Sequence, residues 1–223
     1  MPRRSYDQYC AVARALDVVG DRWTLLVARE LLAGPRRYTD LHADLPGVST
    51  DMLATRLKDM ERDGLAERRR LPAPTSAYVY ELTERGRGLL PVLQALGEWG
   101  APGLAERRPT DAVRAHWLAL PLARQLEALG EPGAVEVRVD EGVFHVRVGG
   151  DPVHPAHPAH PAYPVYGDGV YPDGEPDARL SLEAEVCGEV ARGAVGLVEA
   201  VRGGRVTVTG AGSLAKALRG GTS

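Results

Sequence analysis

The chain is 223 residues long, which suits two domains of roughly 100 residues that each bury a core. Hydrophobic residues make up 44% and charged residues 26%, values typical of globular proteins, and no stretch reaches the roughly 18 unbroken apolar residues that a membrane span requires. Charged residues also interrupt every apolar run that could act as an N-terminal signal peptide. We therefore expect a cytoplasmic protein that does not enter a membrane.

Charge is distributed unevenly along the chain. Residues 1–108 carry a formal charge of +2 and residues 109–223 a charge of −5, which together give the net charge of −3. The N-terminal excess is too small to establish nucleic-acid binding by itself, so the positions of the basic residues must decide. Cys10 and Cys187 lie one in each half, and such a pair does not indicate a disulfide framework.

Apolar residues follow a helical period in the first two segments of the chain. Residues 9–19 place Val12 and Leu16 on one helical face, and a glycine comes next. A second helix is predicted over about 22–33, with Asp21 as its N-cap and a Gly-Pro pair after it. The sequence therefore begins with two helices.

A helix-turn-helix is predicted next. Residues 38–45 form a short helix, a Pro-Gly-Val turn comes after it, and Ser49 is a good N-cap for a further helix whose core positions are Leu53, Leu57 and Met60. The second helix of such a motif lies in the DNA major groove, with its first residues on base edges and later cations on phosphates. Its other faces offer Thr50, Asp51, Thr55, Arg56 and Lys58.

A basic hairpin comes after the helix-turn-helix. The stretches LAERRRL and SAYVYELT alternate as two strands around a tip at residues 72–74, so that three consecutive arginines lie on a protruding wing. Such a wing adds affinity through phosphates or the minor groove. A helix over Glu84–Trp99 then carries a broader apolar stripe than one small domain needs, which suggests a dimer interface.

The segment from DVVGDRW to LQALGEWG closely resembles the HxlR-type winged-helix regulators over about residues 5–105. The shared motifs include Arg22-Trp23, the Gly-Pro-Arg-Arg turn at 34–37 and the Leu82-Thr83 pair with Gly86. The resemblance implies a homodimer joined through the first and last helices of this half, on a pseudo-palindromic operator with half-sites about one DNA turn apart. The DNA-binding residues that we predict are Arg36, Arg37, Ser49, Thr50, Asp51, Thr55, Arg56, Lys58, Arg68, Arg69 and Arg70.

Cys10 falls within this resemblance. In some members of the family a cysteine at this place senses oxidants or electrophiles, which makes Cys10 a candidate redox sensor. The alternative is an inert, small hydrophobic residue.

The C-terminal half reads as an α+β domain over 112–220. A helix is predicted from Ala112 to Leu129, followed by strands at VEVRV, VFHVRV and ARLSL, two short helices over 183–201, the strand RVTVTG and a closing helix over 213–218. This order resembles the sterol carrier protein-like domains, which implies an apolar tunnel for acyl chains or similar molecules. Candidate lining residues, each equally suited to an ordinary core, are Leu118, Leu122, Phe144, Val186, Val190 and Leu197.

The repeat VHPAHPAHPAYP places His154, His157 and His160 three residues apart, a pattern that invites a metal site. Proline at every third position favours a polyproline II helix, in which such histidines are about 9 Å apart and cannot share one ion. We expect a stiff, exposed loop that covers a ligand entrance or contacts a partner subunit, and no metal site.

No catalytic constellation or phosphate-binding loop emerges from the sequence, so we expect neither an enzyme nor a cofactor. The favoured hypothesis is a homodimeric DNA-binding regulator, a repressor, modulated by a hydrophobic small molecule in the C-terminal domain. In a second hypothesis that domain is purely structural or dimerising. In a third, the chain is a lipid carrier whose winged helix makes protein contacts.

Overall fold

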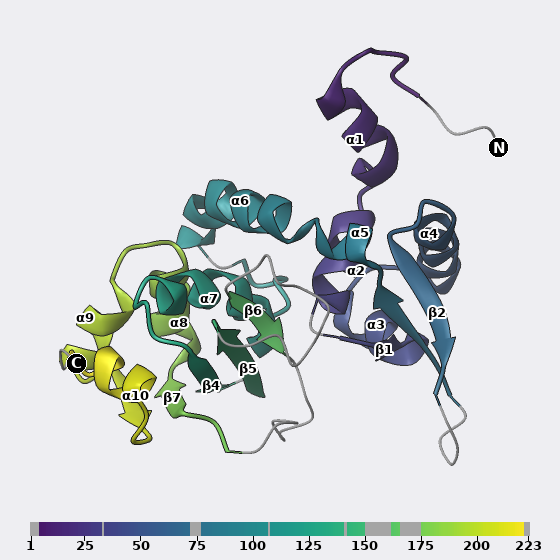
Figure 1. The fold of residues 1–223 in the computed structure, drawn as a ribbon. Helices are drawn as coiled ribbons and strands as arrows, with labels where there is room; N and C mark the ends of the chain where they lie inside the picture. The colour runs from purple at the N-terminus through teal and green to yellow at the C-terminus, as the bar shows by residue number, and fades with distance from the viewer. Residues whose placement is uncertain are drawn as a thin grey trace. The chain divides into compact units, whose positions relative to one another are not determined.

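The computed structural model describes residues 5–32, 34–71, 77–106, 108–140, 142–149, 162–165 and 175–220 (Figure 1). The chain forms two compact units, residues 1–93 and 94–223. The sequence placed the domain limits at 1–105 and 112–220, later than this division. The division falls inside a helix whose last turns belong to the second unit, where Glu98 pairs with Arg124. No helix among the described residues is long and apolar enough to cross a membrane.

Four helices open unit 1, the residues 1–93. They are α1 (Ala11–Val19), α2 (Thr24–Leu31), α3 (Tyr38–Asp44) and α4 (Thr50–Arg62), close to the predicted positions. Asp21 is not the N-cap of α2, because the helix begins later and the Asp21 carboxylate accepts a hydrogen bond from the Trp23 backbone N–H at 3.0 Å. Buried leucines of α2, α3 and α4 form the core of the unit, among them Leu31, Leu41, Leu53 and Leu57.

A three-stranded antiparallel sheet completes the winged part of unit 1. Its strands are β1 (Arg36–Arg37), β2 (Ala66–Arg70) and β3 (Tyr78–Leu82), in the order β1-β3-β2. β2 and β3 form the predicted hairpin, and the proposed tip at 72–74 lies outside the described residues. Because α4 contacts β2, the hairpin lies next to α4 (Figure 1).

A clamp holds the base of this hairpin. The Thr83 hydroxyl donates to the Gly64 carbonyl at 2.6 Å and accepts from the Gly86 backbone N–H at 3.1 Å. A Cβ atom at Gly86 would lie 1.9 Å from the Leu65 carbonyl oxygen, so only glycine fits there. The end of α4 and the end of β3 are thereby fixed to each other.

The single helix predicted over Glu84–Trp99 is two helices, α5 (Glu84–Arg87) and α6 (Leu90–Gly100). Gly88 and Leu89 separate them, and Pro91 falls in the first turn of α6. Proline fits a first turn because the backbone N–H that it lacks has no intrahelical partner there. The restart therefore occurs where proline is tolerated.

In the described residues of unit 2, residues 94–223, five further helices come after the end of α6 and the 3-10 turn η1 (Ala101–Ala105). They are η2 (Ala115–Leu118), α7 (Ala119–Glu127), α8 (Ala184–Ala191), α9 (Leu197–Arg202) and α10 (Ser213–Leu218). The long helix predicted over 112–129 is thus a 3-10 turn followed by α7. Pro121 lies in the first turn of α7 instead of kinking a longer helix.

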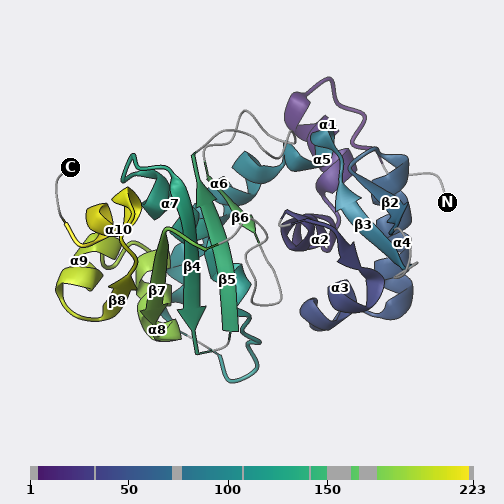
Figure 2. The same ribbon diagram turned by 60° about the horizontal axis from the view of Figure 1, so that its bottom comes forward.

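A five-stranded sheet with the order β6-β5-β4-β7-β8 forms the other layer of unit 2 (Figure 2). Its strands are β4 (Gly133–Val139), β5 (Gly142–Val148), β6 (Ala162–Val165), β7 (Ala178–Leu182) and β8 (Val206–Thr209). β4 and β7 are parallel, and the other pairs are antiparallel. β6 was not predicted, because prolines at 161 and 164 favoured a loop; a proline can occupy an edge strand.

One face of this sheet is apolar and packs against the helices. Val137 of β4 lies opposite Phe144 of β5 and Leu180 of β7, and these side chains are buried with leucines of α7, α9 and α10 in one core. The opposite face carries Glu136 and His145, which are also buried. The α+β class predicted for this half is therefore present, with one apolar and one charged sheet face.

Candidate nucleic-acid interface

Two hydrogen bonds fix the start of α4, the second helix of the helix-turn-helix. The Ser49 hydroxyl caps the helix by accepting from the Met52 backbone N–H at 3.3 Å. The Tyr38 hydroxyl, at the start of α3, donates to the Thr50 carbonyl at 2.7 Å. The first turn of α4 is thereby held against the preceding helix.

α4 has a clear division between its faces. Leu53, Leu57 and Met60 are buried. Asp51, Thr55 and Lys58 are exposed and succeed one another at four- and three-residue steps, so they share the opposite face. Ser49 and Thr50 are exposed at the start of the helix. Five of the predicted DNA-binding residues are therefore accessible on or beside α4.

Arg56 does not belong to this exposed face. Its side chain is 13% exposed and forms ion pairs with Asp21 at 2.5 Å and with Asp59 at 3.1 Å. The guanidinium group thus links α4 to the residues before α2. We assign Arg56 a structural role, which differs from the sequence-based prediction that it contacts DNA.

The three arginines of the wing divide between two faces of the β2–β3 ribbon. Arg68 and Arg70 lie on one face, and the Arg68 guanidinium stacks on the Tyr78 ring at 3.9 Å from its centroid. Arg69 points to the other face and pairs with Glu81 at 2.5 Å. Arg68 and Arg70 are therefore the wing cations best placed to act together.

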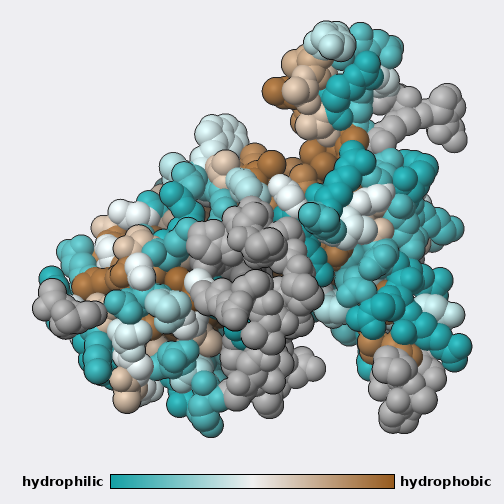
Figure 3. Space-filling view, viewed as in Figure 1, coloured by the Kyte–Doolittle hydropathy of each residue, from teal (hydrophilic) through white to brown (hydrophobic). Residues whose placement is uncertain are grey.

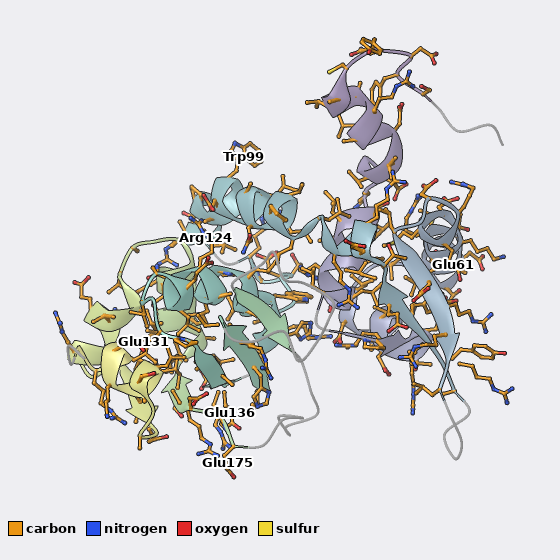
Figure 4. All side chains as sticks on the ribbon, viewed as in Figure 1. Glu61, Trp99, Arg124, Glu131, Glu136 and Glu175 are labelled. Atoms are coloured by element: carbon orange, nitrogen blue, oxygen red, sulfur yellow. The ribbon has the colours of Figure 1, made fainter. Side chains whose placement is uncertain are left out.

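Tyr80 lies opposite Arg68 on the β2–β3 ribbon. Burial raises the pKa of the Tyr80 phenol, against the opposing charge of Arg68, and the carboxylate of Glu61 on α4 adds to the increase. Figure 4 shows Glu61 on α4 beside the β2–β3 ribbon. Teal, hydrophilic atoms predominate over this part of unit 1 (Figure 3). Because α4 contacts β2, the exposed polar residues of α4 and the wing belong to neighbouring elements.

The arginines of β1 differ from each other. Arg36 is mostly buried and pairs with Asp44 of α3, whereas the Arg37 side chain is exposed. The structure therefore gives Arg36 an internal partner and leaves Arg37 accessible.

Two exposed residues of α4 were missed by the sequence reasoning. Arg62 lies four residues after Lys58 on the same face and pairs with Asp59 at 2.6 Å. Met52, in the first turn, is 42% exposed. Helical spacing could have revealed Arg62, whereas Met52 is an apolar residue that a polarity scan passes over.

The six candidate lining residues of unit 2 belong to its core. Leu122, Phe144, Val186, Val190 and Leu197 are almost fully buried in one cluster, and Leu118 packs against it. An open hollow of about 380 Å³ lies elsewhere, at the ends of β4 and β7, and none of the six residues lines it. The ordinary-core reading is the one that matches this packing.

The remaining candidates from the sequence are the cysteines and the histidines of the proline-rich repeat. Cys10 is exposed immediately before α1, whereas Cys187 is buried in the core of unit 2. His154, His157 and His160 lie outside the described residues.

Unit 1 has the element order and the basic hairpin of a winged helix-turn-helix protein. The HxlR-like helix-turn-helix family matches residues 18–107. The chain is 34% identical over 86 residues to YvaP of Bacillus subtilis, an uncharacterized HTH-type transcriptional regulator, an alignment that covers 39% of this chain and 80% of YvaP. It therefore belongs to the HxlR-like helix-turn-helix family.

The chain is also similar to YodB, in sequence and among solved structures. The HTH-type transcriptional regulator YodB of B. subtilis is 36% identical over 85 residues, which cover 38% of this chain and 76% of YodB. Among solved structures, the reduced form of YodB is 34% identical, covers 42% of this chain and 92% of its own, and has a TM-score of 0.38.

Proposed function

We propose that the chain is a sequence-specific DNA-binding transcriptional regulator, a repressor. The carrying observation is the exposed polar face of α4, with Asp51, Thr55 and Lys58 aligned and Thr50 at the capped first turn. In this proposal the first turn reads base edges in the major groove, and Lys58 contacts phosphates. Arg37, Arg68 and Arg70 add electrostatic affinity. The relatives named above are also transcriptional regulators.

The regulator acts as a homodimer in this proposal. On α1, Val12 is 67% exposed and Leu16 44% exposed, and on α6 Val92 is 43% exposed. Brown, hydrophobic atoms along α6 are visible in Figure 3. A second copy that covers these apolar residues would place two α4 helices on a pseudo-palindromic operator.

The dimer is tested with Leu16→Asp, which would bury a charge in the proposed interface. We expect a monomer by light scattering and operator binding weaker by about 100-fold or more, since half of the DNA contacts are lost. Ala11→Asp is the control, because Asp is favourable in the first turn of a helix. A dimeric Leu16→Asp variant with normal DNA affinity would contradict this interface.

For unit 2 we propose a hydrophobic effector site of the sterol carrier protein-like type, between the sheet and α7 and α8. The support is the apolar layer formed by Leu122, Phe144 and Val186. Because these side chains pack closely together, the helices would have to move for a ligand to enter. The close packing itself favours a second candidate, a purely structural role for this unit.

Cys10 is proposed as a redox-sensitive residue, supported by its exposure beside α1. Its oxidation would alter the helix that we assign to the dimer interface. A mild thiol oxidant is expected to release DNA from the wild type but not from Cys10→Ser. An equal response of both proteins would remove the sensor role.

The first experiment is a mobility shift with the DNA upstream of the protein's own gene, with and without a lipid extract of the source cells. Specific binding that the extract relieves supports the ligand-gated repressor. Specific binding that is unchanged by the extract supports a purely structural role for unit 2. Absence of specific binding would contradict the hypothesis of a DNA-binding regulator and would favour the hypothesis of a lipid carrier.

A further inference from the structure

We propose that the first turn of α4 reads two neighbouring pyrimidines in the major groove. Asp51 accepts a hydrogen bond from the N4 amino group of a cytosine, and Met52 packs against the C5-methyl group of a thymine. This inference rests on the proposed function, because it names the bases that the DNA-binding helix selects. It assigns a specificity-determining role to Met52, an exposed apolar residue of the first turn.

The geometry of the first turn suits the reading of adjacent bases. Asp51 and Met52 are both exposed, and the turn that carries them is fixed by the Ser49 cap and by the Tyr38 bond to the Thr50 carbonyl. Consecutive residues of a helix rise by about 1.5 Å and point about 100° apart, so at the N-terminal end of a helix in the groove the two side chains reach different base edges. A fixed turn presents both side chains without the entropic cost of ordering a loop.

Charge selects the partner of Asp51. Within the described residues Asp51 makes no side-chain hydrogen bond or ion pair. An ionised carboxylate is only an acceptor, and DNA phosphates repel it, so its favourable position is opposite an amino group on a base edge. Cytosine offers such a donor, whereas adenine places the N7 acceptor beside its amino group. Cytosine is therefore the base that fits.

Apolarity selects the partner of Met52. The other methionine that the structure describes, Met60, is 1% exposed in the core, whereas Met52 is 42% exposed in the first turn of α4. The thymine methyl is the one apolar group on the base edges of the major groove. The flexible, polarizable thioether can adapt to a methyl group without a preformed pocket. Thymine is therefore the base that rewards a methionine here.

Both residues have simpler explanations that make a different prediction. Asp51 in a first turn stabilises the helix dipole, and single apolar residues occur on any surface. Those roles leave base preference unchanged when either residue is replaced. A change of preference is thus the decisive measurement.

The test is a selection of bound sequences from a random duplex library by the full-length protein. For Asp51→Asn, we expect the preferred base at one position of each half-site to change from cytosine to adenine, by roughly 10-fold, because asparagine pairs with adenine N6 and N7. For Met52→Gln, we expect the thymine preference at the neighbouring position to be lost. Lys58→Ala is the matched control on the same helix and should weaken all sequences about equally.

A second measurement uses the wild-type protein alone, so it does not depend on the folding of a variant. Replacing each thymine of the selected site by deoxyuridine removes only the methyl group. At one thymine position of each half-site, this replacement should weaken wild-type binding about 3- to 5-fold. The DNA affinity of the Met52→Gln variant should not change with the same replacement.

The outcomes separate the two levels of the proposal. If the wild type enriches a motif that neither variant alters and that tolerates deoxyuridine throughout, the pyrimidine reading is wrong and sequence-specific binding stands. If the wild type enriches no motif, the proposed function itself fails.

Discussion

The polar surface of α4 and the wing differs from the charged face of the sheet in unit 2. On the first, Lys58, Arg68 and Arg70 reach solvent from neighbouring elements. On the second, Glu136 is 5% exposed and lies 2.7 Å from Arg138 and 3.7 Å from Arg179. Charges with partners inside a unit stabilise the fold, whereas exposed cations on one surface are available to a partner from outside. The arginine count of a segment does not distinguish the two roles.

The largest effect is expected at Glu136, which Figure 4 shows on the sheet of unit 2. Glu136→Ala should lower the free energy of unfolding by about 2–4 kcal/mol, because it removes a buried carboxylate that holds two arginines. Urea unfolding of the full-length protein measures this. Glu175→Ala is the control, since Glu175 pairs with the same Arg179 but is exposed, and should cost less than about 1 kcal/mol. If both substitutions lowered the free energy of unfolding equally, buried and exposed partners of Arg179 would not differ in their contribution to stability.

Arg56 tests the distinction within unit 1. Arg56→Ala should lower the free energy of unfolding by roughly 1–3 kcal/mol, because Asp21 loses the cation that pairs with it and Asp59 is left with Arg62. At temperatures where the variant is folded, its DNA affinity should show the wild-type dependence on salt. A flatter salt dependence would mean that Arg56 contacts a phosphate after all.

The wing arginines should have the opposite signature. Arg68→Ala and Arg70→Ala are each expected to weaken binding several-fold on all sequences and to reduce the slope of log affinity against log salt by about 0.9, with little change in stability. Binding titrations at several salt concentrations measure both quantities. Arg69→Ala should change the slope less, because Arg69 pairs with Glu81 on the other face. If all three variants reduced the salt slope equally, the two faces of the ribbon would contribute equally to DNA binding.

The smallest effect concerns His145, which lies 3.6 Å from Glu136. Burial lowers the pKa of His145 below its usual value of 6.5, although Glu136 opposes the shift. The unfolded chain then binds the proton more readily, so this contribution to stability is full above pH 6.5 and is lost as the pH falls below that value. Urea midpoints at successive pH values should fall more steeply for the wild type than for His145→Gln. Parallel curves would exclude His145 as the source.

Local signals predicted most of the fold. The cap at Ser49 and the spacing of Leu53, Leu57 and Met60 located α4, and α10 begins and ends at its predicted residues. Interactions between distant residues were not predictable from one sequence. Arg56 is 35 positions from its partner Asp21, and the edge strand β6 depends on pairing with β5 more than on its own proline-containing sequence.

In the candidate site, too, local features were predictable from the sequence and interactions between distant residues were not. Exposed polar positions on α4 could be read from helical spacing, but the division of the wing arginines depends on the register that sets Arg69 beside Glu81. Met52 escaped notice because its significance comes from exposure, which an apolar residue does not signal in a sequence. The hydrophobic lining of unit 2 could not be separated from its core by pattern alone.

The clamp at Thr83 has a consequence for how this protein can change over generations. Thr83 joins Gly64 to Gly86 at the base of the hairpin, and at its other described end the Leu71 backbone N–H donates to the Ala77 carbonyl. Insertions or deletions of residues in pairs in β2 and β3 would preserve the alternation of these strands. The length of the wing can therefore evolve separately from the exposed face of α4.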